Sequence, residues 1–153
     1  MTQEKELLLK DLCARLPYGV ICHYDTIVPM VGKVKSYDKL RAISEFDNKP
    51  CFQFNCNRDI FDFDNIKPYL FPLSSMTDDM MEELNVNGFF KYCDSITNVS
   101  HLKSNKGISE EIYTYIDIEN ISFLIEFFHS HYIDYRGLIE RGLALDATGL
   151  NIY

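Results

Sequence analysis

The residues of this chain that could bind a transition metal are few and badly spaced for it. Zinc sites bring four nitrogen, sulfur or oxygen ligands to one point. The nearest approaches are three pairs: Cys51 with Cys56, Cys22 with His23, and His129 with His131. The first two cysteines would face opposite sides of a strand, and the last two histidines would lie about 200° apart around a helix. We therefore expect core cysteines and structural histidines, with no cofactor.

A run of acidic residues offers a second kind of chemistry. Asp59, Asp62 and Asp64 alternate with aromatic residues, so a strand would present some of these carboxylates on one face. Such carboxylates could hold a divalent cation or exchange protons in a metal-assisted hydrolase. The run lacks the glycine and closing glutamate of a calcium-binding EF-hand loop. The alternative is an edge strand whose charges discourage pairing with another chain.

Covalent catalysis lacks a recognisable signature. A cysteine nucleophile needs a neighbouring base, and the spacing of five cysteines and four histidines selects no pair. Neither a glycine-rich phosphate loop nor a G-x-S-x-G motif is present. We expect a protein that is not an enzyme.

A proline-stiffened segment is better suited to binding. Two prolines hold the stretch Lys67–Met76 rigid, so that it can present Tyr69 and Phe71 at low entropic cost. Ser74 and Ser75 precede a predicted helix, whose free N–H groups attract anions. The alternative is a rigid connector that packs its aromatic rings inward.

The turn that begins at Tyr135 is a second candidate binding spot. It offers the aromatic ring of Tyr135 and the guanidinium group of Arg136. Arg136 could pair with a carboxylate of the chain or hold a ligand anion. The predicted binding residues are therefore Lys67, Tyr69, Phe71, Ser74, Ser75, Tyr135 and Arg136.

Helices at both ends must position these residues. Thr2 is a plausible N-cap for a helix that runs to about Leu16, with Asp11 facing outward. Its buried stripe is formed by Leu7, Leu8, Leu12 and Leu16. The stretch 117–146 has helical periodicity from Ile121 and a cap at Asp117 or Asn120. A second, shorter helix is predicted to open at Tyr135 and to end at Gly142. Together these helices would bury Phe123, Phe127, Phe128, Ile133, Leu138 and Ile139.

Between the helices the pattern favours strands. Four are predicted, over 20–24, 27–34, 40–46 and 51–56, with a turn at Asp47–Pro50. Pro29 suggests an edge position and Gly32 a bulge. The prolines of 66–73 argue against a regular helix or a central strand there. A helix should follow Thr77, then a loop over 85–105 and a strand over 108–116. We predict one α+β domain over 1–153: a small antiparallel, barrel-like sheet covered by N-terminal and C-terminal helices.

The charge and composition restrict the partner and the compartment. The formal net charge of −8 disfavours contact with phosphate backbones, so no nucleic acid is expected. Lys33, Lys35, Lys39 and Arg41 form the only basic cluster, which a solvated strand face would explain. No apolar run is long enough to cross a membrane. The start lacks the pattern of a secretion signal, so we expect a cytoplasmic protein with reduced cysteines.

Three segments together resemble a known family. They are Arg15–Val20 (RLPYGV), Ile66–Thr77 (IKPYLFPLSSMT) and Asp134–Ile139 (DYRGLI), the last followed by Gly142-Leu143-Ala144. This combination resembles a family of small uncharacterised proteins encoded by gut Bacteroides-type bacteria, their phages and mobile elements. The resemblance implies a bacterial or phage-infected cytoplasm and an accessory role.

The leading hypothesis is a non-enzymatic accessory binding protein that acts through a protein–protein interaction surface. It predicts an exposed apolar patch near Tyr69 and Phe71. The alternatives are a small-molecule or nucleotide binder and a metal-assisted hydrolase. The small-molecule binder would take a small anionic ligand at a concave site where the Ser74–Thr77 segment meets the Tyr135–Gly137 turn.

Overall fold

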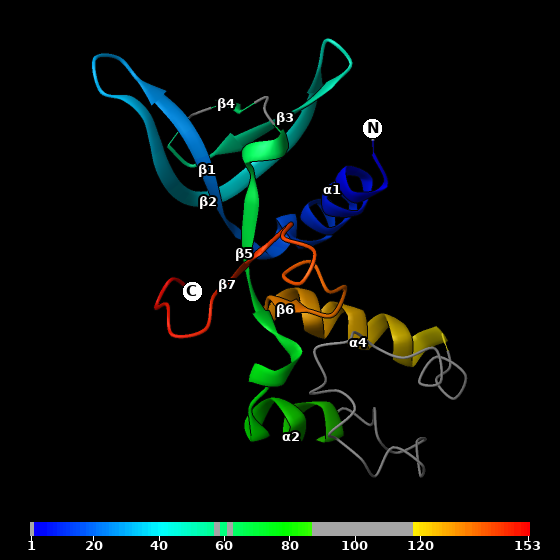
Figure 1. The fold of residues 1–153 in the computed structure, drawn as a ribbon. Helices are drawn as coiled ribbons and strands as arrows, with labels where there is room; N and C mark the ends of the chain where they lie inside the picture. Colours follow the sequence, from blue (N-terminus) through cyan, green and yellow to red (C-terminus); the bar gives the residue numbers. More distant parts are fainter. Residues whose placement is uncertain (1, 57–58, 61–62, 87–117) are drawn as a thin grey trace.

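The computed structural model describes residues 2–56, 59–60, 63–86 and 118–153 (Figure 1). Our expectations of a strand over 108–116, of most of the 85–105 loop and of a cap at Asp117 lie outside these residues, as do the side chains of Asp59 and Asp62. The helices are α1 (Gln3–Arg15), α2 (Asp78–Val86) and α4 (Ile118–Ser130). The strands are β1 (Ile21–Val28), β2 (Gly32–Phe46), β3 (Lys49–Phe54), β4 (Asp59–Ile60), β5 (Lys67–Pro72), β6 (Ile133–Asp134) and β7 (Leu145–Asp146).

The fold is α+β, as the sequence predicted. Its strands lie in the order β4-β3-β2-β1-β5-β6, with β7 also paired to β5. All ladders are antiparallel except the two that β6 and β7 form with β5. The expectation of a barrel-like closure is wrong, because β4 and β6 end the sheet as two-residue strands and no described ladder joins them. The sheet is open.

The first helix forms where the sequence predicts it. Thr2 Oγ1 accepts a hydrogen bond of 3.3 Å from the backbone N–H of Lys5, which caps the first turn. Leu8 and Leu12 are buried, whereas Leu7 and Leu16 pack at the edge of the core. The prediction that Asp11 faces outward is wrong: its side chain is fully buried beside Arg15.

The region predicted as a strand over 27–34 is instead the tip of a hairpin. β1 and β2 pair from Ile21 opposite Lys39 to Val28 opposite Gly32, leaving a three-residue turn that contains Pro29. Met30 and Gly32 adopt positive φ values of 68° and 91°, which turn the chain back on itself. Pro29 and Gly32 therefore mark the turn and not an irregular strand.

β2 is a single strand of 15 residues that serves two hairpins (Figure 1). Its first half pairs with β1 and its second half with β3, with a β-bulge between Leu40 and Ala42. The bulge changes which alternate residues face the core, so Ile43 packs inward and Phe46 is 66% exposed. Regular alternation from Leu40 predicts Phe46 on the same face as Leu40. The predicted turn is confirmed, with Asp47 and Asn48 both at positive φ.

β5 corrects the expectation that two prolines exclude a central strand. It lies between β1 on one side and β6 and β7 on the other. Each of its ladders contains only two residue pairs. Pro68 and Pro72 fit because the hydrogen bonds in this region use the backbone atoms of other residues. The N–H of Phe71 donates to Tyr132 O, and Leu70 O accepts from Ala147 N. Missing proline N–H groups therefore cost these short ladders little.

The C-terminal region contains one helix and not two. After α4 the chain makes the short strand β6 and then a series of turns over 135–143. Asp134 organises these turns, because its two carboxylate oxygens accept from the N–H groups of Leu138 (2.9 Å) and Ile139 (2.8 Å). These bonds stabilise a compact turn. In a helix, the same N–H groups would donate to main-chain carbonyl oxygens instead. Gly142 does take the predicted left-handed conformation, with φ 69°.

Two apolar clusters fill the interior. The larger joins α1 to one face of β1, β2, β3 and β5 through residues such as Leu12, Tyr24, Phe54 and Leu70. The other joins α2, α4 and β6 and includes Leu84, Phe127, Phe128 and Ile133. α1 therefore covers only one face of the central strands.

Candidate binding face

The opposite face of the central strands is open to solvent in the described structure. Successive strand side chains point to opposite faces, and Cys22, Tyr24 and Leu70 point into the core. Their neighbours form a surface that we call the outer face: Ile21, His23, Asp25 and Ile27 of β1, Lys33, Lys35, Tyr37 and Lys39 of β2, and Lys67 and Tyr69 of β5. No described helix packs on it (Figure 1).

The outer face is basic. The register places Lys35 of β2 opposite Asp25 of β1, and Lys67 of β5 opposite His23. Asp25 is the single carboxylate on this face, and Lys33 Nζ lies 2.8 Å from its Oδ2. The hydrogen bond from Lys33 lowers the pKa of Asp25. Four lysines thus outnumber one carboxylate.

Aromatic rings lie among these lysines. Tyr37 stands between Lys35 and Lys39 on β2 and is 65% exposed. Its ring meets Tyr69 of β5 edge to face, with ring centroids 6.5 Å apart. The predicted binding residues Lys67 and Tyr69 therefore belong to the outer face, although Tyr69 is half-buried. The sequence had not connected them with the β2 lysines.

Phe71, the third aromatic residue of the predicted segment, is covered. It packs against the α2–α4 cluster, and its ring centroid lies 5.9 Å from that of Tyr153. Tyr153 also stacks on Tyr132 at 3.7 Å and donates a 2.6 Å hydrogen bond to Tyr69 O. These contacts lie at the border of the outer face. Tyr69 and Phe71 do not form the exposed apolar patch that the sequence predicted.

Exposed apolar side chains gather instead at the end of the β1–β2 hairpin. Ile27 is 80% exposed, Val31 is 72% exposed, and Met30 is fully exposed. We call Ile27, Pro29, Met30 and Val31 the arm tip. Sequence reasoning missed it because an apolar run interrupted by proline was interpreted as a half-buried strand.

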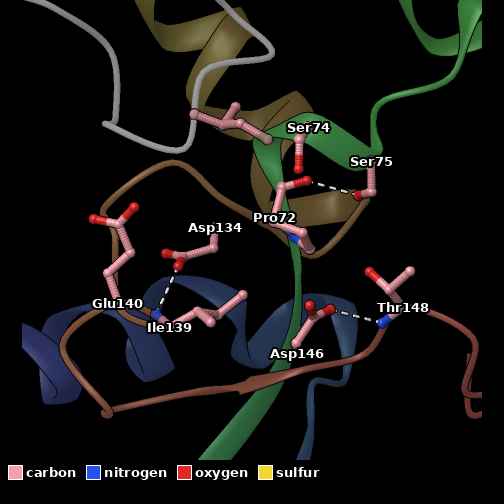
Figure 2. Close-up of a pocket in the computed structure, with 9 residues that line it drawn as sticks. Pro72, Ser74, Ser75, Asp134, Ile139, Glu140, Asp146 and Thr148 are labelled. Carbon is pink, nitrogen blue, oxygen red and sulfur yellow. Dashed lines mark hydrogen bonds between the residues drawn. The ribbon is translucent and has the colours of Figure 1, made fainter.

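Ser74 and Ser75 line a separate pocket of about 340 Å³ (Figure 2). The opposite wall includes Asp134 of β6, and Ile139 and Glu140 from the turns that follow it. The predicted site was to join Ser74–Thr77 to the Tyr135–Gly137 turn, but no residue of that turn is among the described residues that line the pocket. Ser75 Oγ donates a 2.6 Å hydrogen bond to Pro72 O, and Thr77 rather than either serine caps α2.

The charge of this pocket does not suit an anion. Its lining includes the carboxylates of Asp134, Glu140 and Asp146, and no lysine or arginine is among the lining residues that the structure describes. Both oxygens of Asp134 already accept backbone hydrogen bonds. The negative field of three carboxylates would repel a phosphate or a carboxylate ligand.

Arg136 is absent from the pocket lining because it belongs to a buried network. Arg15 Nε lies 2.7 Å from Asp11 Oδ2, and both side chains are fully buried. Arg136 Nε lies 3.3 Å from the other oxygen of Asp11 and donates to Tyr135 Oη at 2.8 Å. With His129, these residues form what we call the Arg15 network: Asp11, Arg15, His129, Tyr135 and Arg136. The guanidinium groups of Arg15 and Arg136 therefore pair with groups of the protein itself.

Tyr135 connects Arg136 to His129 in this network. Because arginine has only donors, Tyr135 Oη accepts from Arg136, and His129 Nε2 lies 3.0 Å from the same hydroxyl, with the donor set by the histidine tautomer. Burial, reinforced by the charge of Arg15, lowers the pKa of His129 to about 4, which favours the neutral imidazole. Burial also raises the pKa of Tyr135.

The candidate metal ligands and nucleophiles have structural surroundings. Among the described residues, no three His, Cys, Asp or Glu side chains are grouped to hold a metal ion. Asp64 forms an ion pair with Lys5 at 2.8 Å. Burial raises the pKa of the Cys22 and Cys13 thiols, which disfavours the reactive thiolate.

None of the family models, curated proteins or solved structures compared with this chain matches it. Within the described residues, no helix is both long enough and apolar enough to cross a bilayer. Two of the three segments that carried the family resemblance meet at the Arg15 network, where Arg15 Nη2 donates to Ile133 O at 2.7 Å, next to Asp134. These two segments therefore contribute to the protein interior.

Proposed function

We propose that this chain is a non-enzymatic accessory binding protein of a bacterium, phage or mobile element, and that it contacts its partner through the outer face. One observation supports this most: four lysines and two tyrosines share a sheet face on which no described helix packs, in a chain of net charge −8. The partner is a macromolecule that carries negative charge.

The separation of charge gives the outer face its physical significance. Since this face carries an excess of positive charge, the rest of the chain is more negative than the average suggests. Such a separation orients the molecule toward a negative partner and repels approach by its other surfaces. A solvated face with no partner does not need this arrangement, because lysines scattered over the surface would serve solubility equally well.

The arm tip adds an apolar contact next to the charged one. Ile27 lies on the outer face opposite Lys33, and Met30 and Val31 continue the exposed apolar surface beyond it. Apolar side chains exposed together are typical of contact sites. A partner seated on the lysines can therefore also bury the arm tip.

Comparison of two matched double variants tests the proposal. The immobilised full chain is exposed to bacterial extract, with and without prior nuclease treatment. Lys35→Gln/Lys67→Gln should capture several-fold less partner than the unmodified chain. Lys10→Gln/Lys49→Gln, which loses the same charge elsewhere, should capture as much. Equal capture by both double variants in both extracts would show that the outer face is not the contact surface.

The pocket beside Ser74 supports a second candidate, the binding of a small polar or cationic molecule. Its concave shape favours a ligand, and its three carboxylates favour positive charge. Spermidine should raise the melting temperature of the chain, and Glu140→Gln/Asp146→Asn should abolish the increase. An unchanged melting temperature with millimolar spermidine would remove this candidate.

A further inference from the structure

We infer that the outer face binds single-stranded nucleic acid. This inference rests on the proposed function and names the partner class. Lys33, Lys35 and Lys39 lie on one face of one strand, which spaces them over roughly 20 Å. Lys67 lies two strands away, about 10 Å across the sheet. An array of this extent matches a phosphate backbone several nucleotides long.

The aromatic residues indicate bases as well as phosphates. Tyr37 is exposed between two of the lysines, and Tyr69 supports it from the side. A base can stack on an exposed aromatic ring of a sheet only when it is not paired within a duplex. Lysines that surround stacking rings are the combination that single-strand binding proteins use.

The composition of the face disfavours a protein partner. The centres of protein–protein interfaces are depleted in lysine and rich in arginine and large apolar residues. The outer face contains four lysines, and one arginine, the exposed Arg41 of the β2 bulge, follows Lys39 at its edge. The expectation of no nucleic acid came from the net charge of the whole chain, which the strand register now divides into a basic face and an acidic remainder.

Fluorescence anisotropy with a labelled 20-nucleotide single strand of mixed sequence tests the inference. For the full chain, log K should fall with log salt concentration with a slope near −3, about 0.7 for each of four phosphate contacts. Lys35→Gln and Lys67→Gln should each reduce the slope by about 0.7. Tyr37→Ala should weaken binding about tenfold and leave the slope unchanged. Lys10→Gln, on α1, is the matched control and should change neither.

Three results would overturn the inference. The first is no binding at 50 mM salt, and the second is equal loss in Lys10→Gln and Lys35→Gln. The third is binding to a duplex of the same length, if Tyr37→Ala does not weaken that binding. If phosphatidylserine vesicles or nuclease-treated extract retain the chain through Lys35 and Lys67, the outer face remains the contact surface and only the nucleic acid is wrong. If binding to nucleic acid, vesicles and extract is all independent of Lys35 and Lys67, the proposed function is wrong as well.

Discussion

Arg15 shows how one buried side chain connects distant parts of this protein. Its guanidinium group pairs with Asp11 and donates to the carbonyl oxygens of Phe128 (3.1 Å) and Ile133 (2.7 Å). It therefore joins α1 to the end of α4 and to β6. The sequence shows an Asp and an Arg four residues apart, a spacing that is usually exposed on a helix. Burial depends on acceptors more than 110 residues away, which no local pattern reveals.

Replacing Arg15 with leucine should lower the free energy of unfolding by about 3–5 kcal/mol, because Asp11 loses its closest buried partner and two buried carbonyl groups lose their donors. Urea unfolding measures this change. Arg141→Leu, at an exposed turn position, should change stability by less than about 0.5 kcal/mol. The double variant Asp11→Leu/Arg15→Leu should lose less than the sum of its single changes. A loss below about 1 kcal/mol for Arg15→Leu would contradict the role given to the network.

His129 should make stability depend on pH. Its pKa in the folded protein is about 4, below the ordinary value of 6.5, so the unfolded chain takes up the proton first as pH falls. The contribution is complete above pH 6.5 and is lost between 6.5 and 4, to a total of up to about 3 kcal/mol. His129→Gln removes this titration and should flatten the stability profile over that range. Parallel profiles for the two proteins would show that folding does not lower the pKa of His129.

Among the elements, β5 was the hardest to predict and matters most for the outer face. Its prolines argue correctly against long ladders, yet the strand is central because its partners pair with it over only two residues each. The β2–β3 hairpin, the first helix and the buried helix near the C-terminus follow from turn residues and periodicity. The bulge in β2 and the turns held by Asp134 depend on tertiary contacts, so the sequence misplaces Phe46 and predicts a helix that does not form.

Tyr153 should stabilise the short seam between β1 and β5. Its hydroxyl donates to Tyr69 O and accepts from Ile21 N at 3.3 Å. Burial raises its pKa, so the hydroxyl keeps its proton. Tyr153→Phe keeps the ring contacts and removes both bonds, which should lower stability by about 1–2 kcal/mol and speed amide exchange at Ile21. Tyr18→Phe, which removes an exposed hydroxyl, should have little effect. Unchanged exchange at Ile21 would show that the seam does not need this hydroxyl.

At the scale of the whole molecule, charge is separated between an acidic body and a basic outer face. The alternation of lysines over 33–39 is visible in the sequence, and Lys67 and Tyr69 were recognised separately as binding residues. Their union depends on β5 lying beside β1. Predicted site residues therefore divide into four groups: Lys67 and Tyr69 on the outer face, Phe71 against the α2–α4 cluster, Ser74 and Ser75 at the pocket, and Tyr135 and Arg136 in the Arg15 network.

Lysine footprinting tests the contact surface most directly. The full chain, free or bound to partner captured from bacterial extract, is acetylated briefly and the modification of each lysine is measured by mass spectrometry. Lys33, Lys35, Lys39 and Lys67 should become several-fold less reactive in the complex, whereas Lys10 and Lys49 should react as before. Protection of Lys10 and Lys49 with unchanged reactivity of the four outer-face lysines would contradict the account.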